Sequence, residues 1–225
     1  MNDSEVPRVT ASATNGSVLA PRTPWQRRGA MVQDAGLVVL SAVFFYANVR
    51  QLVVAGSVTS VFFAAEQGLL VGVFLARRRT STTSSRPMDW AVATIGGWLP
   101  LVLRPGGEGY SGIALAGVSI QMLGLALTMA GFFALGRSFG IVAANRGVKV
   151  SGPYRLLRHP IYFAEFVTSA GFLLANFTIV NAVVVAVVAL CQVARIHAEE
   201  RVLSQSPEYR AYARQVHWRL LPGVY

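Results

Sequence analysis

Six apolar runs constrain the fold of this sequence more than any other feature. Four of them are long (36–49, 57–76, 113–135 and 177–194), and two are shorter (90–103 and 161–175). A helix needs about 20 mostly apolar residues to span a bilayer. We therefore expect the longer runs to cross a membrane, and the shorter two to form tilted, interrupted or re-entrant helices.

The composition agrees with this interpretation. Hydrophobic residues make up 53% of the chain and charged residues only 13%, whereas soluble domains carry about 25% charged residues. The predicted fold class is all-α: a polytopic membrane protein with about five to six transmembrane or re-entrant helices and a C-terminal cytoplasmic region that binds a cofactor.

The basic residues predict the orientation. If the N-terminus is cytoplasmic, the first four runs cross and 161–194 forms a hairpin, all but two of the 20 Lys and Arg residues lie on the cytoplasmic side. The exceptions are Arg50 and Arg104. This asymmetry follows the positive-inside rule, so the net charge of +10 indicates topology and contact with anionic membrane lipids rather than nucleic-acid binding. We expect a multi-pass protein of a bacterial inner membrane with both termini in the cytoplasm.

Three regions follow from these patterns. Residues 1–30 are polar and rich in Ser, Thr, Ala and Pro, which is typical of a disordered cytoplasmic tail. Residues 31–135 are predicted to form a four-helix membrane region, and 136–225 a cofactor-binding region that contains the hairpin 161–194. Glu66 interrupts the second run, and we favour a helix–helix hydrogen bond for it over a functional role.

Charged residues gather around the start of the fifth run, in the stretch GPYRLLRHPIYFAEF at 152–166. Pro160 suits the first turn of a helix, which places Arg158 and His159 at the helix N-terminus. Free backbone N–H groups and the helix dipole attract anions there. We therefore expect an anion-binding site at this point.

The sixth run ends in VARIHAEERVL at 193–203. The fifth and sixth runs are joined only around Asn176, so they must be antiparallel neighbours. The Arg-His pair then meets Glu199 and Glu200 at one membrane surface, where cationic donors and carboxylates together suit a zwitterionic ligand. The three histidines lack metal-ligand spacing, so no metal site is predicted.

These residues carry a resemblance to a known family. RHPIY at 158–162, EERVL at 199–203 and PEYRAYARQV at 207–216 resemble the isoprenylcysteine carboxyl methyltransferase family, to which phospholipid N-methyltransferases are related. The resemblance covers 136–225 and implies binding of S-adenosylmethionine by the C-terminal helices and the loop after them. The family motifs carry over to a set of cofactor-binding residues: Arg158, His159, Pro160, Tyr162, Glu199 and Glu200.

Two departures from the family pattern affect the substrate. Ala164 and Glu165 stand where the family has a small glycine, and Ser206-Pro207 replaces its usual Phe-Gly. Glu165 would alter the substrate channel, so the acceptor stays open. The expected substrate is a lipid or a prenylated small molecule.

The charges of S-adenosylmethionine suggest individual roles. Arg158 and His159 are assigned to its carboxylate, and Glu199 or Glu200 to its ribose hydroxyls or ammonium group. Further candidates for the cofactor pocket are Tyr154, Tyr162 and Leu203.

The acceptor decides which catalytic candidates matter. A carboxylate acceptor is ionised at neutral pH and needs alignment, for which Arg195 or Arg155 is the candidate. An amine acceptor would need to lose a proton, and Glu165 or His197 would then be the relevant base.

Other interpretations stay open. Arg195 and Glu199 are also spaced for a simple helix ion pair, and Arg155 and Arg158 for positive-inside anchors. The alternatives to carboxyl methylation are a phospholipid or amine N-methyltransferase, an NADPH-dependent sterol-type reductase and a non-enzymatic membrane adaptor.

Overall fold

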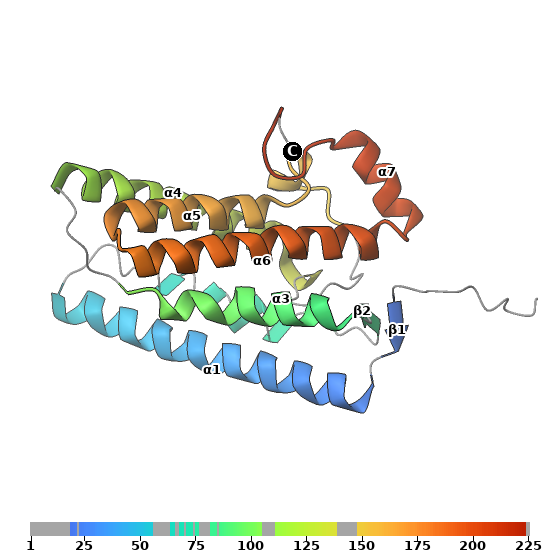
Figure 1. Cartoon of the computed structure of the whole chain (residues 1–225), viewed down its shortest axis with the longest axis horizontal. Helices are drawn as coiled ribbons and strands as arrows, with labels where there is room; N and C mark the ends of the chain where they lie inside the picture. Colours follow the sequence, from blue (N-terminus) through green and yellow to red (C-terminus); the bar gives the residue numbers. More distant parts are fainter. Residues whose placement is uncertain are drawn as a thin grey trace, which may run out of the picture.

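The protein is a helical bundle, and its C-terminal segment lies at one end of the bundle (Figure 1). The computed structural model describes residues 19–21, 23–55, 64–65, 68–69, 71–73, 75–76, 82–84, 86–104, 111–138 and 148–223. The α-helices in these ranges are α1 (Pro24–Ala55), α3 (Pro87–Trp98), α4 (Ser111–Leu135), α5 (Pro160–Ala175), α6 (Ile179–Leu203) and α7 (Pro207–Gln215). Short 3-10 helices are η1 (Leu99–Val102), η2 (Gly136–Ser138) and η3 (Gly152–Arg155).

The predicted all-α class is confirmed, with one small addition. Two three-residue strands, β1 (Leu19–Pro21) and β2 (Thr82–Ser84), pair antiparallel with Leu19 opposite Ser84. The pair lies beside the start of α1 (Figure 1).

Among the described residues, three helices are long and apolar enough to cross a membrane. They are Pro24–Val54, Gly112–Leu135 and Ile179–Leu203, and α5 is a shorter apolar helix. The predicted short run 90–103 forms α3, which has 12 residues, followed by η1, which contains Pro100. At about 1.5 Å per residue, α3 is too short to cross a bilayer alone. Much of the predicted run 57–76, including Glu66, lies outside the described residues.

The boundary predicted for the disordered tail is wrong at its C-terminal side. Residues 24–30 already belong to α1, because Thr23 and Gln26 form a capping box: Thr23 N–H donates to Gln26 Oε1 at 3.0 Å, and Gln26 N–H donates to Thr23 Oγ1 at 3.3 Å. Pro24 occupies the first helical position, which it favours. Residues 1–18 of the predicted tail lie outside the described ranges.

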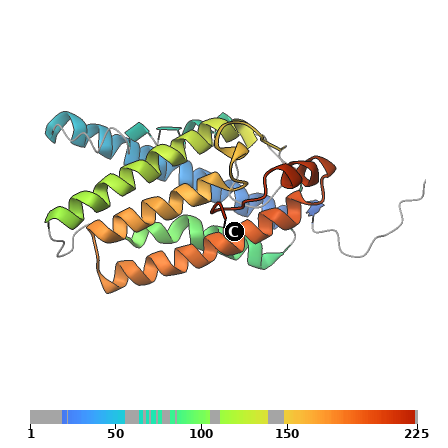
Figure 2. The same ribbon diagram turned by 90° about the horizontal axis from the view of Figure 1, so that it is seen from above.

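Helices α4, α5 and α6 lie side by side (Figure 2). The contact between α4 and α5 depends on glycines, because their backbones touch. A Cβ on Gly117 would lie 2.6 Å from Ala175 N, one on Gly124 2.5 Å from Thr168 N, and one on Gly171 2.3 Å from Gln121 N. Small residues at such contacts are the usual means of close helix packing in membranes.

Helix α6 is tied to the α3 segment at both ends. At one end, Asn181 Oδ1 accepts from Arg104 N at 3.2 Å, and Asn181 Nδ2 donates to Arg104 O at 2.9 Å. At the other, Arg201 Nη2 donates to the buried Asp89 Oδ1 at 2.6 Å, and Ser84 Oγ donates to Asp89 Oδ2. These contacts fix the position of α6 along α3.

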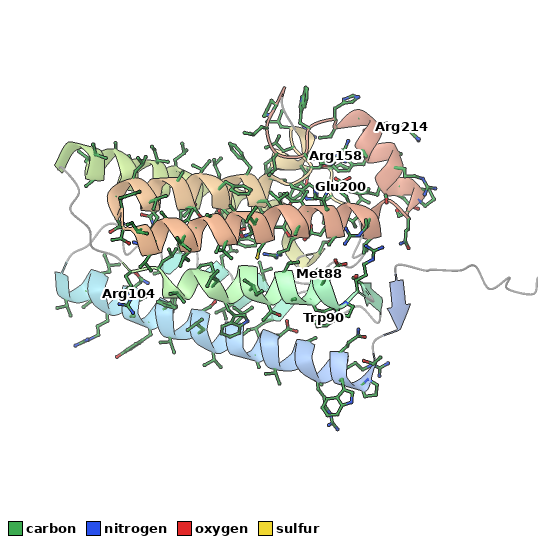
Figure 3. All side chains as sticks on the ribbon, in the orientation of Figure 1. Met88, Trp90, Arg104, Arg158, Glu200 and Arg214 are labelled. Carbon is green, nitrogen blue, oxygen red and sulfur yellow. The ribbon has the colours of Figure 1, made fainter. Side chains whose placement is uncertain are left out.

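The predicted orientation separates Arg104 from the basic residues of the C-terminal region. Figure 3 places Arg104 at the end opposite Arg158 and Arg214. The starts of α1, α3 and α5 share the end that carries α7 (Figure 1). The assignment of that end to the cytoplasm stays a prediction.

Candidate functional site

The hairpin of α5 and α6 brings the two sequence motifs together. Only residues 176–178 join the helices, and the Thr178 side chain caps α6 by accepting from Asn181 N at 3.0 Å. Pro160 begins α5, and His159 is its N-cap residue. Since the hairpin is tight, the start of α5 faces the end of α6, where Arg158 and Glu200 point toward each other (Figure 3).

The Glu200 carboxylate is the centre of a polar cluster. His159 Nε2 lies 3.0 Å from Glu200 Oε1, Arg158 Nη1 lies 3.2 Å from Oε2, and Tyr209 OH donates to Oε1 at 2.7 Å. Arg219 Nε is 3.8 Å from Oε2. Glu200 is therefore held by side chains from three parts of the chain: the residues before α5, helix α7 and the C-terminal segment.

Arg158 holds the C-terminal segment onto the start of α5. Its Nε donates to Val216 O at 2.7 Å, and its Nη2 donates to Ala213 O at 3.0 Å and His217 O at 3.2 Å. The backbone repeats the contact, because Arg158 N donates to Trp218 O at 2.9 Å. A cofactor carboxylate would have to compete with these bonds, so the role of Arg158 as a direct cofactor ligand stays a prediction.

Glu199 is more open than its neighbour. Its side chain is 23% exposed, against 14% for Glu200. Tyr162 OH donates to Glu199 Oε1, and His159 Nδ1 lies 3.7 Å from Glu199 Oε2. The buried His159 ring thus lies between the two carboxylates, and a role of Glu199 as a cofactor ligand stays a prediction.

A second set of polar groups continues from Tyr162 into the hairpin. The Arg195 guanidinium carbon lies 5.1 Å from the centre of the Tyr162 ring, a cation–π contact. Arg195 Nη1 donates to Gln192 Oε1 at 2.8 Å, and Gln192 Nε2 donates to the Glu165 carboxylate. Arg195 and Glu165, both predicted as catalytic candidates, are thereby joined through a glutamine.

Tyr154 lies at the site, and Arg155 does not join it. Tyr154 is buried in η3, with Glu199 close enough to contribute to the raised pKa of its phenol, for which burial is the main cause. Within the described part of the chain, the Tyr154 hydroxyl makes no hydrogen bond. The Arg155 side chain is exposed and makes no hydrogen bond or ion pair with the described residues of the cluster.

Leu203 packs against the cluster of Tyr209, Tyr212 and Val216, where α7 meets the end of α6. Its partners there are protein side chains, so its place in the cofactor pocket stays a prediction.

Two tyrosines of α7, Tyr209 and Tyr212, donate hydrogen bonds to residues of the site. Burial raises the pKa of Tyr212 to about 12, so its hydroxyl stays protonated and donates to Tyr154 O at 2.7 Å and Leu157 O at 3.3 Å. Burial and the Glu200 carboxylate also raise the pKa of Tyr209 well above its usual value. Both phenols therefore act as permanent hydrogen-bond donors.

Sequence reasoning missed three parts of this arrangement. Gln192 had a signal, because an amide inside an apolar run is a candidate functional group. Tyr209 lies in the family-like stretch at 207–216, from which no role was predicted for it. The segment that contains Arg219 had no signal, since its contacts depend on how the chain returns across α5.

Residues 117–205 match the family model described as the isoprenylcysteine carboxyl methyltransferase (ICMT) family. Residues 117–205 are therefore similar to the ICMT family. The matched region contains α5 and α6 with both motifs, and it ends before α7. The family assignment predicted from RHPIY and EERVL is thereby confirmed. A comparison with curated proteins found no match.

With the three long apolar helices of its described residues, the chain is an integral membrane protein, and the family that residues 117–205 match is one of membrane methyltransferases. In the described residues, no group of three or more His, Cys, Asp or Glu side chains is arranged to hold a metal ion.

Proposed function

We propose that this protein transfers the methyl group of S-adenosylmethionine to the carboxylate of a lipidic or isoprenoid acceptor resembling isoprenylcysteine. The observation that carries the proposal is the division of labour between the two adjacent glutamates. The Glu200 carboxylate is occupied by contacts with other protein side chains. The Glu199 carboxylate contacts Tyr162 and His159, and its side chain is more exposed than that of Glu200.

The donor set fits the cofactor. Bound S-adenosylmethionine supplies an electrophilic methyl group on a sulfonium. Glu199 is placed to accept from its ammonium group or its ribose hydroxyls, and the Tyr154 hydroxyl is a further donor beside it. Arg158 and His159 hold the C-terminal segment and the two carboxylates in place around this position.

The acceptor side is supplied by Arg195. Its guanidinium lies over Tyr162, one helical turn before Glu199, and guanidinium groups suit carboxylates. An acceptor carboxylate needs no base, so the protein's task is to align it with the cofactor and exclude water. Alignment of two reactants can supply on the order of 7–11 kcal/mol. A lipid tail would stay between or beside the apolar helices while the head group reaches Arg195.

An amine acceptor is the second candidate. It is favoured by Glu165, whose carboxylate lies in the hairpin near Arg195 and is linked to it by Gln192. Glu165 would then take the proton of the amine, and the reaction would be a phospholipid or amine N-methylation.

The orientation belongs to the same proposal. We place α7 and both termini in the cytoplasm of a bacterium, with the bundle in the inner membrane. The basic end would contact anionic lipids, and the site would open to the side on which S-adenosylmethionine is made.

Calorimetric titration with S-adenosylhomocysteine tests the cofactor, with NADPH as the parallel control. Micromolar binding of S-adenosylhomocysteine alone is expected. Binding of NADPH alone would favour the reductase as the function of this protein. Binding of neither, in detergent and in lipid nanodiscs alike, would favour the adaptor.

A further inference from the structure

We propose that Asp89 is a positioning residue: it holds Arg201 against α3 and thereby fixes the direction in which Glu199, in the same turn of α6, faces the cofactor. The proposal rests on the proposed function in taking Glu199 as a ligand of S-adenosylmethionine. It assigns a role to a residue that lies outside both sequence motifs and outside the region that matches the family model.

The end of α6 is held from two sides by different helices. Helix α6 contacts both α5 and α3, which lie above and below it in Figure 1. Tyr162 of α5 donates to Glu199, whereas Arg201 Nη2 donates to Asp89 Oδ1 of α3 at 2.6 Å. Successive residues of an α-helix are about 100° apart, so Glu199 and Arg201 point to nearly opposite sides. A rotation of the helix end would therefore disturb both contacts at once.

Asp89 provides a fixed point because it is itself buried and bonded. Its side chain is 5% exposed, and Ser84, whose Oγ donates to the second carboxylate oxygen, is fully buried. Arg86 N donates to Ser84 Oγ at 3.3 Å, and Trp90 Nε1 donates to Ser84 O at 3.1 Å. These groups belong to β2 and to the start of α3, so Asp89 is anchored independently of α6.

The charges make this contact directional. Asp89 and Arg201 form an ion pair, and opposite charges attract more strongly away from water. Asp89 also lies in the first turn of α3, where the helix dipole favours a negative charge. The Arg201 side chain is 36% exposed. Without Asp89 it would turn toward solvent, and the last turn of α6 would lose its ion pair with α3.

The opposite end of the same helix pair supplies a matched control. Asn181 is 1% exposed and bonds to both the N–H and the carbonyl oxygen of Arg104. At about 1.5 Å per residue, it lies about 27 Å along α6 from Glu199. A loss of stability at this end should therefore leave the direction of Glu199 unchanged.

Asp89→Leu and Asn181→Leu are compared by titration with S-adenosylhomocysteine well below the Tm. Each change removes a buried polar side chain of similar size, and both should lower the Tm. Asp89→Leu should raise the Kd about 3- to 30-fold, whereas Asn181→Leu should keep it within about twofold of wild type. A wild-type Kd in Asp89→Leu, or equal weakening in the two variants, would overturn the proposal.

Arg201→Met tests whether Asp89 acts through Arg201, and it decides the question alone if Asp89→Leu does not fold. It should weaken binding by a factor similar to that of Asp89→Leu, and wild-type affinity would refute the proposal. Because both changes break the same contact, their effects should not add. The Kd of Asp89→Leu/Arg201→Met should therefore lie within about twofold of either single variant; multiplied effects would contradict the role of Arg201.

A measurement without any cofactor separates this proposal from the proposed function. Amide hydrogen exchange reports local opening of a helix, so exchange at residues 199–203 should be faster in Asp89→Leu than in Asn181→Leu. Equal exchange in the two variants would refute the positioning role whatever the cofactor is. Failure of the wild-type protein to bind S-adenosylhomocysteine would instead contradict the proposed function.

Discussion

Glu199→Gln and Glu200→Gln are neighbouring, isosteric changes for which the structure predicts opposite outcomes. Side-chain nitrogens of His159 and Arg158 and the hydroxyl of Tyr209 lie within 3.2 Å of the Glu200 carboxylate oxygens. Neutralising it leaves Arg158 and His159 without their shared anion in a largely buried place. Removing one member of a buried ion pair costs about 3–5 kcal/mol, and each kcal/mol lowers the Tm of a chain of this size by about 2–4 °C. The expected loss is therefore about 6–20 °C.

Glu199→Gln should leave the fold almost intact. Among the described residues, the Glu199 side chain accepts a hydrogen bond from Tyr162 OH, and a glutamine oxygen still accepts it, so the cost should stay below about 1 kcal/mol. The cofactor, however, loses a charged partner worth about 1.5–3 kcal/mol, which corresponds to about a 10- to 150-fold weaker affinity for S-adenosylhomocysteine.

Thermal unfolding in detergent, followed by titration with S-adenosylhomocysteine well below the Tm, measures both quantities. The wild-type protein and the two variants are compared under identical conditions. Equal Tm values for the two variants, or wild-type affinity in Glu199→Gln, would refute the division of labour between these residues.

Four further outcomes are expected. Arg158→Met should release the C-terminal segment, seen as faster proteolysis after α7 in the variant than in wild type; an unchanged cleavage pattern would contradict the anchor role. Gly124→Val should destabilise the α4–α5 contact by about 1–3 kcal/mol or more, because Thr168 N would lie 2.5 Å from the new Cβ; an unaltered Tm would show that the helices can separate freely. Asp89→Asn should lower the Tm, because it removes the ion pair with Arg201, and Asp89→Glu should lower it less. Tyr212 has its pKa raised from 10.0 to about 12 in the folded protein, so its contribution to stability is complete below pH 10 and is lost as the pH rises toward 12; Tyr212→Phe should remove this part of the alkaline decline.

The membrane helices and the hairpin are the parts that sequence could predict. Long apolar runs predict helices that lie in the membrane. Because only a short link around Asn176 joins α5 and α6, the two helices must be antiparallel neighbours. The meeting of Arg158 and His159 with the glutamates followed from that geometry and is present in the structure.

The division between Glu199 and Glu200 could not be predicted. The two residues are adjacent and chemically identical, and only the return of the C-terminal segment and Tyr209 distinguishes them. The start of α1 was missed for another reason, since the capping box of Thr23 and Gln26 is a local signal that a polar composition conceals.

Gln192 shows a third limit. Its side chain bonds to Glu165 in the other helix of the hairpin and to Arg195 one turn along its own helix. These contacts depend on how the two helices pack, so the position of Gln192 in the sequence does not predict them.

Transfer of a labelled methyl group tests the central claim most directly. Wild-type protein in lipid nanodiscs is incubated with methyl-labelled S-adenosylmethionine and a probe, a prenylated cysteine that carries a free carboxylate. The carboxamide analogue of this probe is the control. We expect label on the carboxylate probe alone, released as methanol by mild alkali, as a methyl ester requires. Label that resists alkali, or no transfer by protein that binds S-adenosylhomocysteine, would contradict carboxyl methylation.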